Sequence, residues 1–365
     1  MAREAITNRR RPGWKELTAT GLYRTGMLRM AQKLSRSYEL RMSPKQLLPR
    51  LRYVSGSKFA ILCYHRIGSG GVPLYSALPP EIFEAQVRFL REHYRIVSLD
   101  ELFVGIQNPV SLEQAVTITF DDGYRDLYTQ AFPILQKYKI RATIYLTVGS
   151  IETAQAAWYD RIFVALKSLP SNQLEIVLER PRIFQFDSLE ARIRAGIEIV
   201  AYLRTLPDKR RRDWCISLER QIPVPEQELA DRMLTWAQVN AMQQEGIAFG
   251  SHTMTHPVFS RVPPAEMERE LLESKQILEA RIGVPIKDFA YPFGKPSDCG
   301  PGAPELLARC GYRTAATTTE GVNVAGVNPY SLRRTQIGEE RSLAMFVFKL
   351  NQLFLCDSHN GLNDA

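Results

Sequence analysis

The sequence predicts an α/β protein, a distorted (β/α) barrel of seven or eight strand–helix units with a mainly helical insertion. Short buried apolar runs alternate with amphipathic helical patterns along most of the 365 residues. The alternation stops between about residues 150 and 233, where helical patterns dominate and no convincing buried strand is predicted. Several polar residues follow the predicted strands, and in barrels the chemistry collects at these strand ends.

The first half of the barrel is predicted from its strands. Residues 115–120 are rich in β-branched and aromatic side chains, which is typical of a buried strand. Similar runs predict strands at residues 59–65, 94–97 and 142–148. Pro79-Pro80-Glu81 opens a helix, and a second helix is predicted around residues 127–138. Because strands and helices alternate, we expect parallel strands joined by crossover helices.

The second half resumes after the insertion. Thr235 is the predicted N-cap of a helix that runs to Glu245. A helix from Pro264 to Arg281 has apolar residues on one side and is followed by Gly283, a usual C-cap. The other predicted elements are strands at 247–250, 288–291 and 312–317, a helix at 303–310, a short run at 332–337 and a final helix from about 341.

The composition predicts a soluble globular chain in three parts. Apolar residues make up 45% and charged residues 24%, and the apolar runs are shorter than the roughly 20 residues of a membrane span. We expect a basic N-terminal arm at 1–57, a domain at 58–340 that contains the insertion, and a C-terminal helix and tail at 341–365.

The positive charge is concentrated in the arm. Residues 1–58 carry 14 Lys or Arg against 3 Glu, so the remainder of this chain of net charge +8 carries −3. Apolar residues between these charges allow either a basic amphipathic helix at an anionic membrane face or a solvated helical extension. A nucleic-acid partner is not expected, because the body is acidic. Five cysteines without a CxxC pair, and no visible secretory signal, favour reduced thiols in the cytoplasm.

Two carboxylates follow the strand at 115–120. Asp121 and Asp122 repel each other unless a cation or a hydrogen-bond network holds them, so the pair indicates a metal site or, alternatively, an ordinary Asp-Asp-Gly turn. His252 and His256 follow the strand at 247–250. Two His and one Asp leave an open coordination position, as in catalytic metal sites, although two surface histidines are the alternative. His65 also lies at a strand tip.

Two motifs carry a resemblance to a known family. Thr119-Phe120-Asp121-Asp122-Gly123 and Ser251-His252-Thr253-Met254-Thr255-His256 resemble the first two motifs of the polysaccharide deacetylases, also called NodB-homology or carbohydrate esterase family 4 proteins. The resemblance covers roughly residues 58–340. It implies a NodB-type barrel, with Asp121 as general base and with Asp122, His252 and His256 as ligands of Zn²⁺, or of Co²⁺ or Ni²⁺.

Three further residues are implied to contact the substrate. Ala290-Tyr291-Pro292-Phe293-Gly294 resembles the third family motif, but alanine stands where an arginine usually braces the catalytic Asp. The Phe293 N–H matches the position that helps to bind the oxyanion, and Tyr291 belongs to the same motif. Trp236 matches the tryptophan of the acetyl pocket. The alternatives are a strand-ending turn for Tyr291 and Phe293 and a core position for Trp236.

The general acid is displaced from its usual place. The late Leu-x-His motif is absent around Leu332-Arg333-Arg334, and His359 lies in the polar tail. Tyr64-His65 resembles the early Tyr-His of the poly-N-acetylglucosamine deacetylase branch, which implies that His65 is the acid. A structural histidine is the alternative.

The resemblance implies a metal-dependent hydrolase that removes acetyl groups from N-acetylated sugars. The expected substrate is a polysaccharide, an oligosaccharide or a lipid-linked glycan precursor of surface-polysaccharide metabolism. An O-acetyl carbohydrate esterase and a catalytically inactive carbohydrate-binding relative are the alternatives. We expect a cytoplasmic location, with the basic arm near the inner membrane face. The sequence predicts no oligomeric state.

Overall fold

The computed structural model describes residues 58–356, apart from residues 70, 73–74, 108–111, 113, 154–155, 223, 230–231 and 339. The predicted basic arm at 1–57 and the tail with His359 lie outside the described residues. The boundaries assigned to these parts, and the membrane contact of the arm, therefore stay predictions. Within the described ranges, no helix combines the length and the apolar character that crossing a membrane requires.

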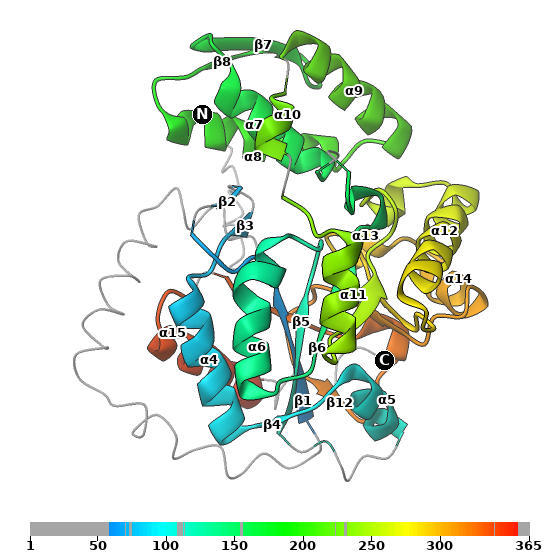
Figure 1. The fold of residues 1–365 in the computed structure, drawn as a ribbon. Helices are drawn as coiled ribbons and strands as arrows, with labels where there is room; N and C mark the ends of the chain where they lie inside the picture. The colour runs from blue at the N-terminus through cyan, green and yellow to red at the C-terminus, as the bar shows by residue number, and fades with distance from the viewer. Residues whose placement is uncertain are drawn as a thin grey trace, which may run out of the picture. The chain divides into compact units, whose positions relative to one another are not determined.

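A curled, mainly parallel sheet forms the centre of the domain (Figure 1). Its strands follow the order β11-β10-β9-β6-β5-β1-β12, with β4 beside β5 and β13 beside β1. Only the β1–β12 pair is antiparallel among the pairs of this sheet that the structure describes. The predicted distorted (β/α) barrel is thus confirmed. The strands are β1 Lys58–Tyr64, β4 Arg95–Ile96, β5 Ala115–Phe120, β6 Ala142–Leu146, β9 Ala248–Ser251, β10 Asp288–Ala290, β11 Thr314–Ala316, β12 Asn323–Val324 and β13 Thr335–Gln336.

The register of the sheet brings distant residues to one edge. Every residue of β1 and β5 is buried, as the apolar runs predicted. Tyr64 pairs with Phe120 in the parallel register, so His65 and Asp121 leave the sheet beside each other. In the same way Leu146 pairs with Ser251, which places His252 at the end of β6.

Helices cover the sheet, and their ends carry the predicted signals. Thr235 caps α11 and shares a capping box with Gln238, while Gly283 ends α12 in the left-handed conformation. The C-terminal helix α15 packs on α4 through Phe346 and Phe89. The helices are α4 Pro80–His93, α5 Leu99–Gln107, α6 Phe132–Tyr138, α11 Trp236–Gln244, α12 Pro264–Ile282, α13 Pro296–Cys299, α14 Ala303–Arg309 and α15 Leu343–Cys356.

The insertion has its own hydrophobic core and lies above the carboxyl ends of β5 and β6 (Figure 1, green). Its elements are α7 Trp158–Ser168, β7 Gln173–Val177, β8 Pro181–Gln185, α8 Leu189–Leu203, α9 Asp208–Gln221 and α10 Glu226–Leu229. The insertion is mainly helical, and it also contains the antiparallel hairpin β7–β8, which the sequence analysis did not predict. The hairpin buries only alternate residues of β7, so its sequence lacks the continuous apolar run of a strand buried on both faces.

Candidate active site

Asp121 is a buried carboxylate held by an arginine. It directly follows β5, and the Arg334 guanidinium donates two hydrogen bonds of 2.7 Å, one to each carboxylate oxygen. Arg334 is fully buried and its Nε donates to the Thr317 carbonyl at 2.8 Å. Burial alone would raise the pKa of Asp121, but the charge and hydrogen bonds of Arg334, together with the nearby His252 and His65, outweigh burial and hold the pKa well below its usual range. Asp121 is therefore ionised.

Arg334 is a site residue that the sequence analysis missed. Alanine at 290 removes the usual bracing arginine, and Arg334 supplies a guanidinium from a different part of the chain. The parallel pairing of β13 with β1, which aligns Thr335 with Leu62, carries Arg334 to Asp121. The only signal in the sequence was the Leu332-Arg333-Arg334 segment, where a histidine was expected instead.

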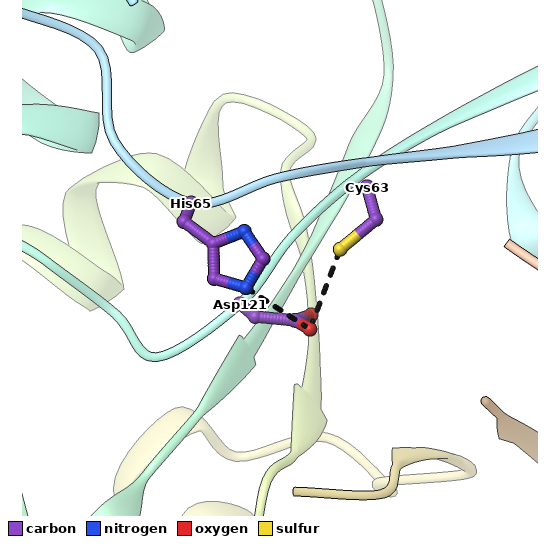
Figure 2. Close-up of side chains that lie close together, drawn as sticks. All are labelled: Cys63, His65 and Asp121. Atoms are coloured by element: carbon purple, nitrogen blue, oxygen red, sulfur yellow. Dashed lines mark hydrogen bonds and ion pairs between the residues drawn. The ribbon is translucent and has the colours of Figure 1, made fainter. Parts of the chain in front are cut away.

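His65 and Cys63 lie beside the same carboxylate (Figure 2). His65 Nε2 is 4.0 Å from Asp121 Oδ2, and the Cys63 thiol donates to that oxygen with Sγ at 3.4 Å. Burial lowers the pKa of His65, although the charges of Asp121 and Asp122 oppose this shift. The His65 side chain retains 11% exposure, whereas Asp121 retains 2%.

Asp122, His252 and His256 form a second buried group. One ligand atom from each lies within 4.8 Å of the other two. Asp122 Oδ1 is 3.4 Å from His256 Nε2 and 3.6 Å from His252 Nε2. His252 Nδ1 lies 2.7 Å from the Ala290 carbonyl, so the proton belongs on Nδ1 and the Nε2 lone pair faces Asp122. Burial lowers the pKa of His252 to about 4, which keeps this imidazole neutral at pH 7.

These three residues fit a divalent metal ion. Both oxygens of Asp122 are buried and have no hydrogen-bond partner among the described residues. An unpaired buried carboxylate is costly, whereas a cation would satisfy it. Two imidazoles and one carboxylate are a usual ligand set for Zn²⁺ in catalytic sites. The donor set thus agrees with the predicted ligands, although the roles stay predictions.

The turns that present the ligands have unusual backbone geometry. Asp122, Thr253, His256 and Phe293 have φ angles of 72°, 72°, 54° and 59°, in the left-handed region that L-residues rarely adopt. Glu270 of α12 holds the His252–His256 loop by accepting hydrogen bonds from the N–H groups of Met254 (2.8 Å) and Thr255 (3.0 Å). Such strain persists only where the surroundings over-determine it, and it concentrates at functional sites.

The insertion contacts the metal-ligand loop directly. The Trp158 indole Nε1 donates to the His256 carbonyl at 3.1 Å. The rings of Tyr159 and Phe293 pack edge-on against the His256 imidazole, with centroids 5.1 and 4.9 Å away. Two aromatic residues at the start of α7 therefore help to fix His256, one of the predicted metal ligands.

The other predicted substrate residues differ in position. The Phe293 N–H donates to no acceptor within the described part of the chain, and its ring lies against His256. The Tyr291 side chain is instead buried in an aromatic cluster with Phe289, and its hydroxyl donates to the Tyr330 carbonyl at 3.1 Å. Trp236 packs under the Arg281 guanidinium at the start of α11. Trp158, not Trp236, is the tryptophan that the structure brings to His256.

Asp160 is a buried carboxyl group next to this site. The Tyr124 hydroxyl donates to its Oδ2 at 2.9 Å, while Oδ1 has no partner among the described residues. Burial raises the pKa of Asp160 to about 7, against smaller opposing effects of the Tyr124 hydrogen bond and of Arg232. The neighbouring Arg161 pairs with Glu219 at 2.7 Å.

The fold and this pair of buried groups agree with the polysaccharide deacetylase family, which the sequence motifs resemble. The family model described as "Polysaccharide deacetylase" matches residues 110–315, more than half of the chain, and the chain belongs to this family of hydrolases.

Individual relatives have low sequence identity to this chain. YxkH of Bacillus subtilis, a protein assigned to the polysaccharide deacetylases, is 23% identical over 292 residues, which cover 80% of this chain and 75% of YxkH. The poly-β-1,6-N-acetyl-D-glucosamine N-deacetylase of Staphylococcus aureus strain N315 is 31% identical over 124 residues. That match covers 30% of this chain and 41% of the relative.

Two solved structures share the fold. The Streptococcus pyogenes deacetylase PplD, in complex with acetate, aligns with a TM-score of 0.55 and 22% identity, over 82% of this chain and 99% of PplD. IcaB from Ammonifex degensii aligns with a TM-score of 0.53 and 19% identity, over 81% of this chain and 97% of IcaB. These likenesses support the barrel architecture.

Proposed function

We propose that this protein is a metal-dependent N-deacetylase that hydrolyses the acetamido group of N-acetylhexosamine units in a glycan. The observation that carries the proposal is the adjacency of two buried groups. One is the Asp121 carboxylate braced by Arg334, and the other is the Asp122–His252–His256 group, in which the Asp122 oxygens have no protein partner in the described chain. A base beside a metal site is the arrangement that metal-assisted hydrolysis requires.

Each group has a role in this reaction. Asp122, His252 and His256 would hold a divalent ion, which would supply Lewis acidity toward the acetyl carbonyl and the attacking water. Asp121 accepts the proton of that water, because it is ionised and is held in one orientation by Arg334. The Phe293 N–H is available to donate to the developing oxyanion.

His65 is the proposed acid for the leaving amine. An amide nitrogen must gain a proton before it departs, whereas an alkoxide from an ester departs more readily without one. Burial favours neutral His65, so the imidazole has to gain a proton during the reaction. Its Nε2 lies 4.0 Å from Asp121 Oδ2, so the proton that Asp121 accepts is within a short distance of the imidazole.

The identity of the glycan is also part of the proposal. The S. aureus relative is named for poly-β-1,6-N-acetyl-D-glucosamine, which supports a hexosamine substrate. We further propose a cytoplasmic, membrane-proximal glycan precursor as the natural substrate, on the basis of the positive charge of residues 1–57. Localisation of the full-length protein outside the cytoplasm in a fractionation experiment would contradict this part.

Acetate release tests the reaction. Metal-free protein is refilled with Zn²⁺, Co²⁺ or Ni²⁺ and mixed with N-acetylglucosamine oligomers or with an O-acetylated sugar. We expect metal-dependent release from the oligomers, abolished in Asp121→Asn but retained in Asp187→Asn, a control in the insertion. Release from the ester alone would instead establish the O-acetyl esterase. Binding of the oligomers without any release would favour the inactive carbohydrate-binding relative.

A further inference from the structure

A cavity lies between the insertion and the barrel, and the residues that line it do not include Asp121, Asp122, His252 or His256. Its volume is about 620 Å³, within the range of small-molecule sites. The insertion contributes residues from the start of α7 and from one face of α9, including Trp158 and Ile216. The barrel contributes the loops that follow β6 and β9, including Gly149 and Met254.

The cavity combines apolar surface with charged side chains that are already paired. Ala156, Ala157 and Trp158 are buried apolar residues of its wall. Arg161 donates two hydrogen bonds to the Glu219 carboxylate, at 2.7 and 2.8 Å. On α9, two more lining residues, Arg211 and Arg212, both pair with the buried Asp208, and Arg212 also pairs with Glu266 at 3.5 Å.

These pairs determine which ligand the cavity suits. Because each lining guanidinium has a carboxylate partner, the cavity has little net charge to attract an anion. A wholly apolar ligand would remove water from these charged edges and return no hydrogen bonds. The cavity therefore suits an uncharged ligand that can also form hydrogen bonds. A sugar unit is such a ligand, since its ring has apolar C–H faces and its hydroxyl groups both donate and accept hydrogen bonds.

Trp158 links the cavity to the metal-ligand loop. It lines the cavity, its Nε1 donates to the His256 carbonyl, and its ring centroid is 6.0 Å from that of Phe293. Met254 and Thr255, which also line the cavity, directly precede His256. Trp158 therefore contacts both the cavity and the loop that carries His256.

We propose that this cavity is a subsite for an uncharged sugar unit of the same glycan, remote from the unit that is deacetylated. This inference rests on the proposed function for the choice of glycan. The subsite favours longer chains, because a sugar unit bound in the cavity adds contacts that a disaccharide held only at the reaction site lacks. The insertion thus determines substrate length.

Binding of N-acetylglucosamine oligomers tests the subsite. Calorimetry with the zinc-loaded full-length Asp121→Asn protein gives the Kd of a hexasaccharide and of a disaccharide without turnover. Ile216→Trp narrows the cavity. Its matched control is Ile197→Trp on α8. Both isoleucines are exposed on insertion helices, but only Ile216 lines the cavity. Glu219→Gln weakens the charged acceptor, and Glu228→Gln is its control, since Glu228 pairs with Lys167 elsewhere in the insertion.

We expect Glu219→Gln to reduce the ratio of hexasaccharide to disaccharide affinity about tenfold, the size of one lost hydrogen bond to a charged group. Ile216→Trp should reduce the ratio at least as much, because the larger side chain occupies space that the sugar unit needs. The control variants retain the wild-type ratio. Equal ratios in cavity and control variants, or no hexasaccharide binding at all, would overturn the inference.

Acetate release, measured in parallel, separates the two proposals. If no oligomer is deacetylated but the cavity variants still lose hexasaccharide affinity, the proposed reaction fails and the subsite stands. If oligomers of all lengths are deacetylated with the same KM in cavity and control variants, the reaction stands and the subsite fails.

Discussion

The Asp121–Arg334 pair is the clearest single interaction of the site. Both groups are buried, and the guanidinium meets the carboxylate with two parallel hydrogen bonds. Such bidentate geometry holds the carboxylate in one orientation and stabilises its ionised form. Removal of one partner from a buried ion pair leaves an uncompensated charge. The resulting loss of folding free energy is usually larger than the net stabilisation that the intact pair provides.

Replacement of Arg334 therefore affects both stability and reaction. We expect Arg334→Met to lower the free energy of unfolding by about 3–5 kcal/mol. Without the guanidinium, burial raises the pKa of Asp121, so the acidic limb of the pH–rate profile moves to higher pH. Urea unfolding and acetate release between pH 5 and 9 check these outcomes. Arg333→Met is the control, and similar profiles for the two variants would contradict the role of Arg334.

Asp160 provides a separate prediction for pH and stability. Its pKa is about 7 in the folded protein and 3.8 ordinarily, so the folded state binds the proton more tightly. This contribution to stability is complete below pH 3.8 and is lost as the pH rises through 7. Asp160→Asn keeps the acceptor for Tyr124 but carries no charge. We expect this variant to be more stable than wild type at pH 8, by up to about 4 kcal/mol, and equal to it near pH 4.

Urea unfolding at both pH values measures this difference. The control is Asp213→Asn, an exposed aspartate paired with Lys209, which should show no pH-dependent difference. A loss of stability in Asp160→Asn at pH 8 would show that the folded protein uses the ionised carboxylate.

At the scale of elements, α7 is joined to the loop that follows β9. Trp158 holds the carbonyl of His256, whose left-handed backbone needs support from its surroundings. Trp158→Phe keeps an aromatic ring but removes the indole donor. We expect about a tenfold weaker affinity for Zn²⁺, the usual effect of removing an outer partner of a metal ligand.

Chelator competition measures this affinity without any substrate. Trp214→Phe is the matched control, because the Trp214 indole also donates to a backbone carbonyl, that of Val177, within the insertion. Equal zinc affinities for the two variants would mean that the hydrogen bond from Trp158 does not position His256.

Features that neighbouring residues encode could be predicted from the sequence, whereas features that depend on tertiary packing could not. The strands β1 and β5 and the Asp121-Asp122 pair were predicted because continuous apolar runs and adjacent residues carry their own pattern. Arg334 could not be predicted, since β13 is only two residues long and its pairing with β1 depends on the whole sheet. Trp158 and Trp236 both begin helices, so only tertiary packing decides which one reaches His256.

For the whole molecule, the metal and the fold are expected to stabilise each other. Metal binding to the folded state alone adds about 4 kcal/mol at a free metal concentration one thousand times the Kd. The pKa of His252 is about 4 in the folded protein and 6.5 ordinarily, so its contribution to stability is complete above pH 6.5 and is lost as the pH falls through 4. We expect metal-free protein to lose stability over this range.

Urea unfolding in EDTA at pH 7, 5.5 and 4.5 checks the expectation, with His252→Gln as the comparison. The wild-type decline between pH 7 and 4.5 should exceed that of the variant by about 2 kcal/mol. Parallel declines would assign the acid sensitivity to other groups.

The hydrogen bond from Trp158 to the His256 carbonyl also limits how the chain can be rearranged. The insertion resembles a separate module, because it has its own core and its own hairpin. Yet one of its residues, Trp158, donates the hydrogen bond that positions His256, a proposed metal ligand in the barrel. In a chimera that exchanges the insertion without replacing this donor, His256 would be less firmly positioned. The two parts are therefore expected to have changed together during evolution, and grafting experiments should transfer them as a pair.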